Sequence, residues 1–146
     1  MGLSRGAVNI GSSGSIIAQS VNSKPGKIVI GSPSNNSVRV AGNIDVSAPK
    51  RSISPSGTVI VQGRRVTHTG NIYANGRSGG KIKVLSTENL KLDGSLFATG
   101  NKDKGGSVIV MSENSIQTSA KTVIDVSGQL KGGTAQLLAK VKNKVS

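Results

Sequence analysis

The feature that most constrains this chain is a repeated unit of alternating residues. One unit, GKIKVLSTENLKLDGSLFATGNKDKGG, runs from Gly80 to Gly106 and contains three short segments in which apolar and polar residues alternate. The following segment, GSVIVMSENSIQTSAKTVIDVSGQLKGG, repeats this plan with different residues. Alternation with a period of two is typical of β-strands, and self-similarity at this spacing is typical of solenoids, propellers or arrays.

The glycines that open successive units show how the period varies. They stand at positions 26, 57, 80, 106 and 133, so the spacing drifts between 23 and 31 residues because the turns differ in length. The alternation excludes helical repeats, and propeller blades are longer and usually richer in aromatic residues. The sequence therefore predicts an all-β fold, a parallel β-helix (solenoid) with three short strands per rung and about five to six rungs.

The alternation also predicts which side chains form the core, because successive residues of a strand point to opposite faces. In each rung, two aliphatic residues of every strand should point inward and stack on their equivalents in the next rung. The inward residues expected with a clear register are Ile28, Ile30, Val59, Val61, Ile82, Val84, Val108 and Val110 in the first strands, Val38, Val40, Val66, His68, Leu90, Leu92, Ile116 and Thr118 in the second, and Ile44, Val46, Ile72, Ala74, Leu96 and Ala98 in the third. Ile124 or Val126 continues the third column.

The chain is interpreted as a single β-helix domain over residues 1–146. Residues 1–25 form an irregular or partial N-terminal rung, 26–137 form the regular rungs, and 138–146 form a basic C-terminal strand or tail. Neither end contains an obvious capping helix. Because uncapped solenoids tend to stack end to end, we expect either a segment of a longer solenoid or the subunit of a fibre.

The charge is strongly positive, with 19 Lys and Arg against six Asp and Glu, a net charge of +13. Such an excess indicates an anionic partner or surface, or else a charged coat that keeps sheet edges from pairing. The absence of cysteine excludes disulfides, thiolate catalysis and cysteine zinc sites. No run approaches the roughly 18 apolar residues of a membrane span, and no cofactor or metal site is predicted.

Basic residues recur just before each rung restarts, and stacked turns should place them along one edge of the solenoid. These candidate polyanion-binding residues are Lys24, Lys50, Arg51, Arg77, Lys102, Lys104 and Lys131. Charge repeated at rung spacing suits a linear polyanion, such as a sulfated glycan, a lipopolysaccharide or a nucleic acid, through salt-sensitive contacts. The alternative is that these are ordinary solvated turn charges.

The two aromatic residues, Tyr73 and Phe97, fall at equivalent outward positions of neighbouring third strands. We expect them to stack on the surface, in one column with Asp45 and Asp125, and to offer a contact to a glycan or a protein partner. The alternative is that they are scattered surface hydrophobic residues.

Enzymatic groups are sparse. Glu88 and Glu113 occupy similar turns one rung apart, a spacing that a pair of glycosidase carboxylates could have, but the turns carry no aromatic platform for a sugar. His68, the only histidine, has no second ligand or nucleophile beside it and is interpreted as structural. The prediction is that the protein has no catalytic residues and is not an enzyme.

The pattern GGxIxV…xLxLxGxIxAxG…GGxVxV, as it stands in GGKIKVLSTENLKLDGSLFATGNKDKGGSVIVMSENSIQTSAKTVIDVSG, resembles the β-helical repeats of filamentous-haemagglutinin-like exoproteins. These are large bacterial adhesins and toxin carriers secreted by the two-partner route. The resemblance covers about residues 26–137. It implies a right-handed β-helix, an extracellular or bacterial cell-surface location, and a stalk or adhesive role.

The expected function is that of a non-enzymatic structural or adhesive module that binds an anionic glycan or cell-surface polymer. Nucleic acid is a less favoured partner, and self-association or flanking rungs are further partners to consider. The alternative function is a subunit of a self-assembling extracellular fibre. A polysaccharide-degrading β-helix enzyme is the third.

Overall fold

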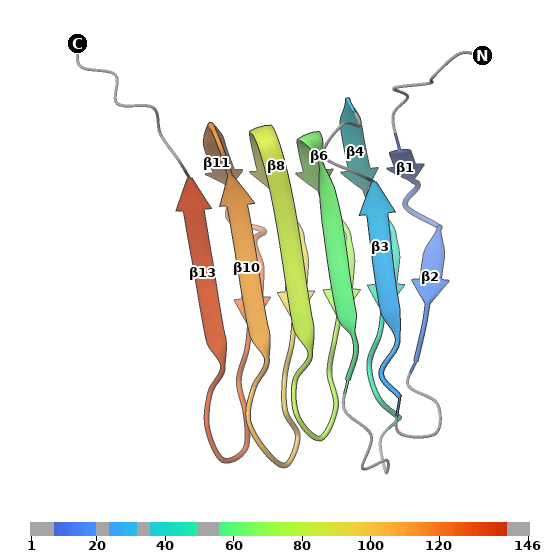
Figure 1. The fold of residues 1–146 in the computed structure, drawn as a ribbon, viewed down its shortest axis with the longest axis vertical. Coiled ribbons are helices and arrows are strands. Elements are labelled where there is room, and N and C mark those ends of the chain that lie inside the picture. The colour runs from blue at the N-terminus through green and yellow to red at the C-terminus, as the bar shows by residue number, and fades with distance from the viewer. Residues whose placement is uncertain (1–7, 20–23, 32–35, 50–55, 140–146) are drawn as a thin grey trace.

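The protein is a parallel β-solenoid. The computed structural model describes residues 8–19, 24–31, 36–49 and 56–139, which form thirteen strands and no helix. The coils stack side by side along one axis, with β1 and β2 at one end and β13 at the other (Figure 1). The predicted parallel β-helix is confirmed. It has about four turns, close to the expected five to six rungs, because the described part of each terminal rung is incomplete.

The first and second strands of the rungs belong to one eight-stranded sheet in which every pairing is parallel. Its first-strand positions are held by β3 (Lys27–Gly31), the beginning of β6 (Thr58–His68), the beginning of β8 (Lys81–Leu92), β10 (Ser107–Ser112) and β13 (Thr134–Ala139). Its second-strand positions are held by β1 (Val8–Ile10), β4 (Ser37–Val40), the ends of β6 and β8, and β11 (Ser115–Thr118).

The third strands form a separate sheet on the opposite side of the core. It runs in the order β12 (Val123–Asp125), β9 (Ser95–Phe97), β7 (Asn71–Tyr73), β5 (Asn43–Asp45) and β2 (Ser15–Ile17). Every rung therefore repeats the same path, and equivalent residues of successive rungs are direct neighbours.

The two central rungs differ in one respect from the predicted three separate strands. In β6 and β8 the first and second strands are joined into one long strand that bends over the top of the solenoid (Figure 1). The pairing of β6 with β8 shifts register between Gly63 and Arg65. An irregularity of this kind bends a strand without ending it, so two predicted strands are continuous there.

The core consists of the predicted aliphatic columns. Ile44, Ile72 and Leu96 are direct neighbours in the third-strand sheet and are all 0% exposed. The inward residues expected from Ile28 to Val110, in three complete rungs and the first strand of the next, are buried without exception. Ile116, Ile124 and Val126, in the last rung, pack only partly against the core. Thr118 was also expected to point inward, but it is exposed, because β11 has no further strand beside it among the described residues. The core is thus built from aliphatic side chains stacked from rung to rung, without the large aromatic residues common in globular cores.

Candidate functional site

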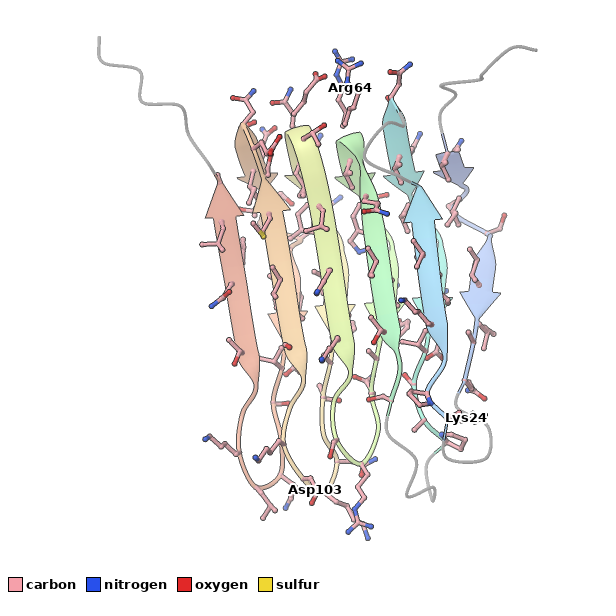
Figure 2. All side chains as sticks on the ribbon, in the orientation of Figure 1. Lys24, Arg64 and Asp103 are labelled. Atoms are coloured by element: carbon pink, nitrogen blue, oxygen red, sulfur yellow. The ribbon has the colours of Figure 1, made fainter. Side chains whose placement is uncertain are left out.

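The described members of the predicted basic set lie along one edge of the solenoid, in the turns that lead from a third strand to the next first strand. Figure 2 shows Lys24 and Asp103 at this lower edge and Arg64 at the opposite one. The described members are Lys24, Arg77, Lys102, Lys104 and Lys131, and together they are called the basic edge. All five are exposed. Lys50 and Arg51 lie outside the described residues.

Within the basic edge, Lys104 and Lys131 are closest to the predicted column of stacked charge. Their backbones form a parallel bridge, so they are neighbours in successive rungs at the roughly 4.8 Å spacing of paired strands. Neither side chain has an ion pair among the described residues. Two ammonium groups at this spacing repel one another and attract an anion that can reach both.

Beside these lysines runs a shallow groove of about 360 Å³. Its floor is made by three glycine pairs from successive rungs, Gly79–Gly80, Gly105–Gly106 and Gly132–Gly133, and Lys81 joins Lys104 and Lys131 in its lining. We call it the glycine groove. It therefore presents three lysines around a strip of bare backbone.

Five of the six glycines of the groove are required by the packing of the rungs, and Gly132 is the exception, because nothing lies within 4 Å of a Cβ atom at that position. A Cβ atom on Gly105 would lie 1.7 Å from the carbonyl oxygen of Val126 in the third strand of the following rung, and one on Gly80 would lie 2.2 Å from the oxygen of Gly57. Several of their N–H groups are already used, since Gly105 donates to Lys131 and Gly106 donates to Ala98. The positive charge that attracts an anion to the groove thus comes from the lysine side chains.

Arg77 differs from the lysines of the basic edge because it has an acidic partner. The Arg77 Nε atom lies 3.1 Å from Asp103 Oδ2 on the next rung, and the Ser78 hydroxyl donates to the same oxygen at 3.4 Å. This acid partly neutralises Arg77. Lys104 and Lys131, beside the glycine groove, have no such acidic partner among the described residues.

Comparison with known proteins adds no identification. No family model, curated protein or solved structure matches this chain. In the part of the chain that the structure describes, no helix is long and apolar enough to cross a membrane. The same residues contain no group of three or more His, Cys, Asp or Glu side chains that could hold a metal ion.

Tyr73 and Phe97 form the predicted stacked pair. Their ring centroids are 5.4 Å apart and the ring planes are inclined by 7°. Asp45 and Asp125 flank them in the same outward column, as expected. Each ring covers one face of the other, so a ligand can reach only the outer faces and the edges. The two aspartates accept backbone hydrogen bonds from Ser47 and Ser127, at 2.8 and 2.9 Å, which fixes the turn after the third strand.

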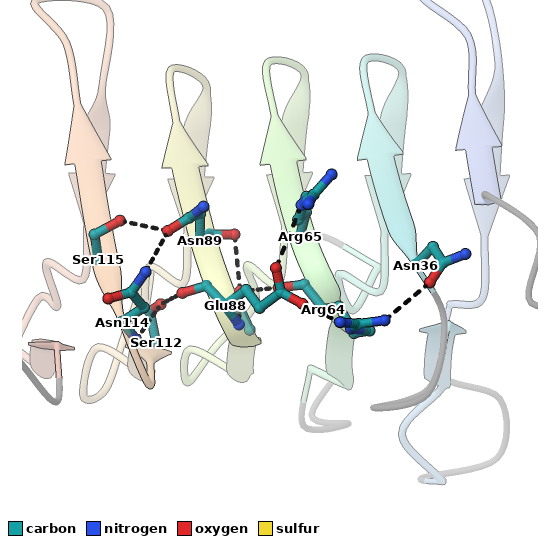
Figure 3. A network of polar contacts seen from close by, with 9 residues as sticks. Asn36, Arg64, Arg65, Glu88, Asn89, Ser112, Asn114 and Ser115 are labelled. Carbon is teal, nitrogen blue, oxygen red and sulfur yellow. Dashed lines mark hydrogen bonds and ion pairs between the residues drawn. The ribbon is translucent and has the colours of Figure 1, made fainter. Parts of the chain in front are cut away.

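Glu88 lies at the opposite edge of the solenoid, in a network of charged and amide groups that the sequence reading did not identify (Figure 3). Its Oε2 atom is 2.5 Å from Arg64 Nη2, and its Oε1 atom is 3.4 Å from Arg65 Nε. One signal was present: the Arg64-Arg65 pair stands at the turn that precedes Glu88 by one rung. Both oxygens of Glu88 thus face guanidinium groups.

The same network contains an amide contact between two successive rungs. Asn114 Nδ2 donates to Asn89 Oδ1 at 2.9 Å, and the Ser115 hydroxyl donates to the same oxygen at 2.9 Å. A further amide contact, from Asn71 Nδ2 to Asn43 Oδ1 at 3.1 Å, joins two rungs at the start of the third strand. These ladders hold successive turns in register.

An apolar groove of about 500 Å³ lies near the bend between first and second strands. Leu85, Met111 and Leu138 are neighbours in one outward column and form its walls. The nearby hydroxyl of Ser112 donates to the Glu88 carbonyl oxygen, so it is already engaged. This groove offers apolar contact rather than a cluster of reactive groups.

His68 is fully buried in the second-strand column between Val40 and Leu92, in agreement with the predicted structural role. Its Nε2 atom lies 3.2 Å from the carbonyl oxygen of Ser95, so Nε2 carries the proton, and Nδ1 has no partner among the described residues. Desolvation by burial lowers the pKa of His68 below 6.5, although the hydrogen bond to Ser95 opposes this shift. The native state therefore favours the neutral imidazole.

We expect this burial to make the protein less stable in mild acid. As the pH falls through 6.5, the unfolded chain takes up a proton at His68 that the native state does not. The melting temperature should thus decrease as the pH is lowered from about 7.5 to about 5. The decrease should be smaller in the variant His68→Leu. Leucine matches the neighbouring Leu92 in this column. An unchanged pH dependence in the variant, followed by thermal unfolding, would assign the effect to other groups.

Proposed function

We propose that this chain is a non-enzymatic structural and adhesive module of a bacterial surface or secreted exoprotein. The stacked core makes a stiff rod, and the basic edge binds an anionic glycan or another anionic cell-surface polymer. The observation that carries this proposal is the set of three lysines, Lys81, Lys104 and Lys131, around the glycine groove. In the described residues these side chains form no ion pair with an acid.

A linear polymer suits this arrangement better than a small anion. The groove is open and shallow and crosses three rungs, so it has no walls that would enclose a compact ligand. A polymer with regularly spaced charges can instead contact several rungs at once. Each contact is weak at the surface, but contacts joined along one polymer add through effective concentration.

The stacked pair of Tyr73 and Phe97 is a second contact in the proposal. It lies on the outward face of the third-strand sheet, which meets the turns of the basic edge. A polymer that leaves the edge along this face would meet an apolar patch between Asp45 and Asp125. The pair would then select for a sugar with an apolar face over a polymer that offers charge alone.

The absence of catalysis is also part of the proposal. Glu88, the most plausible carboxylate for a polysaccharide-cleaving enzyme, forms ion pairs with Arg64 and Arg65, so both of its oxygens are already engaged within the protein. Cleavage of a polysaccharide that Glu88→Gln abolishes would overturn this part. The extracellular location and the likeness to filamentous-haemagglutinin-like adhesins are proposed on the repeat pattern alone.

Binding to heparin, a sulfated glycan, tests the proposal directly. We expect Lys104→Glu/Lys131→Glu to weaken binding about tenfold or more at low salt, since each contact is worth roughly 1 kcal/mol in water. The slope of log affinity against log salt concentration should become shallower by about two, one for each lost contact. Isothermal titration at several salt concentrations measures both quantities.

The matched control is Arg39→Glu/Lys121→Glu. It makes the same change in net charge at exposed positions away from the basic edge, on β4 and in the turn after β11. Equal losses in the two variants would show that heparin responds to net charge and not to the edge. Tighter binding to single-stranded DNA than to heparin at equal salt would favour nucleic acid as the partner.

A further inference from the structure

The two ends of the solenoid are stepped, and the steps are complementary. At one end β13 supplies the first strand of a rung, and the outer edges of β11 and β12 have no strand beside them in the described residues. At the other end β1 and β2 supply a second and a third strand, and β3 pairs only with β6 among the described residues. One end therefore has an extra first strand, and the other end lacks a first strand at the same position.

Both ends also leave the core columns open. Val8, Ile10 and Ala18 at one end, and Ile116, Ile124 and Val126 at the other, are only partly buried against the core. On β13, Leu137 continues the column of Val110 and is 44% exposed, whereas Val110 is 0% exposed. Apolar side chains that continue a buried column are stabilised by any surface that extends that column.

We propose that two copies of this chain associate head to tail: the β13 end of one copy docks on the β1 and β2 end of the next, and the coil continues without a break. The strand β13 of one copy pairs with β3 of the next, while β11 pairs with β1 and β12 pairs with β2. All three pairings are parallel and copy pairings that exist inside the molecule, such as β3 with β6, β1 with β4, and β2 with β5. The joint therefore uses only strand pairings of a kind already present within one copy.

The register of the joint follows from the internal columns. Each inward residue of one copy meets the residue that holds the same position in the next rung. The columns stay apolar across the joint except where Thr118 meets Ile10. The expected neighbours are Ala135 with Ile28, Leu137 with Ile30, Ile116 with Val8, and Ile124 with Ile16, the first of each pair from one copy and the second from the next. A shift of one residue would turn these columns outward.

Antiparallel pairing of two β13 edges is the competing contact, and the steps argue against it. Such a pairing would join one strand from each copy and leave β11 and β12 without partners in both. Head-to-tail docking pairs all three strands and covers Ile116, Ile124 and Leu137 together. A head-to-tail contact also repeats, so it forms filaments rather than closed dimers.

The joint brings basic residues together, which predicts how salt acts. Lys131 of one copy lies beside Lys24 of the next, as Lys104 lies beside Lys131 within one copy. Each copy also carries a net charge of +13. Because salt screens this repulsion, we expect association to strengthen as salt increases. Binding of a polyanion has the opposite salt dependence, so the two proposals can fail independently.

Disulfide trapping tests the joint, because the chain has no cysteine of its own. Gln136 and Val29 stand in the same outward column and are both exposed, so Gln136→Cys and Val29→Cys disturb no core packing. Within one copy the two positions are four strand spacings apart, about 19 Å, well beyond disulfide reach. At the joint they become neighbours. Oxidation of the double variant in high salt should therefore give a ladder of covalent oligomers on a non-reducing gel.

The controls separate this joint from other contacts. Each single variant can form at most a dimer, and Gln136→Cys with Asn9→Cys places the second thiol on β1, which meets β11 at the joint. A ladder no stronger than that of this control pair would overturn the proposal. Dimers of Gln136→Cys alone that form as readily as the oligomers of the double variant would overturn it in favour of antiparallel pairing.

A second measurement does not depend on thiols. Leu137→Asp places a charge in the open core column and should raise the dissociation constant for self-association in sedimentation experiments about tenfold or more. Met111→Asp makes the same change in charge at a residue that is 41% exposed and lies on β10, which is already paired on both edges within one copy, and should leave association intact. Filaments that persist in Leu137→Asp, seen by electron microscopy, would rule out this end as the docking surface.

Discussion

Gly106→Ala is expected to lower the free energy of unfolding by about 3 kcal/mol or more, a large effect for one methyl group. The Cβ atom of the alanine would lie 2.0 Å from the carbonyl oxygen of Gly80 and 2.6 Å from the carbonyl carbon of Gly79. Both atoms belong to the backbone of the preceding rung and cannot rotate away. Relief requires separation of two coils whose spacing is set by hydrogen bonds, including the one that Ser107 N donates to Gly80 O at 2.9 Å.

Gly132→Ala is the matched control, because nothing lies within 4 Å of a Cβ atom at that position. The melting temperature should fall by roughly 6 to 12 °C in Gly106→Ala and hardly change in Gly132→Ala. Thermal unfolding followed by circular dichroism measures both. Similar values for the two variants would mean that the coils can separate locally and that the glycine pairs are not fixed by rung packing.

Leu96→Ala should cost about 2 to 5 kcal/mol, the usual range for leucine truncation in a packed core. Leu96 is 0% exposed and stands between Ile72 and Ile124 in its column. Because these neighbours are held in place by the backbones of their own rungs, the cavity cannot close by a shift of a single strand. Urea unfolding at constant pH measures the loss.

Phe97→Ala is the comparison on the next residue of the same strand. It removes a larger side chain, but Phe97 points outward and packs on Tyr73 at the surface. The loss should therefore be smaller than for Leu96→Ala, about 0.5 to 1.5 kcal/mol from the ring pair together with some lost apolar burial. A greater loss at Phe97 than at Leu96 would contradict the assignment of inner and outer faces.

The core could be predicted from the sequence because each inward column depends only on local alternation and on the period of the rungs. The inward orientation of Ile72 and Leu96 could be predicted from the alternation in their own strands and from the glycines that align the rungs. The stacking of Tyr73 on Phe97 followed from the same alignment. Residues at equivalent positions of successive rungs become neighbours in any solenoid.

The charged groups were harder to place, because turns do not keep a fixed length. Arg77 and Lys104 both precede a new rung, yet only Lys104 stacks on a lysine, whereas Arg77 reaches Asp103 on the longer turn of the next rung. The contact of Arg64 with Glu88 likewise depends on a register shift at Gly63. Insertions and bulges change which side chains face each other, and the alternation of the strands carries no information about them.

The path of the coil also determines how the protein would respond to mechanical force. Because β1 and β13 lie at opposite ends of the stacking axis, tension applied through them acts across the strands and opens their hydrogen bonds one pair after another. The coil would then unwind rung by rung from an end. A rung such as that from Gly80 to Gly106, 26 residues long, would release roughly 90 Å of extended chain. As part of a stalk, the solenoid would lengthen under tension in steps, one rung at a time.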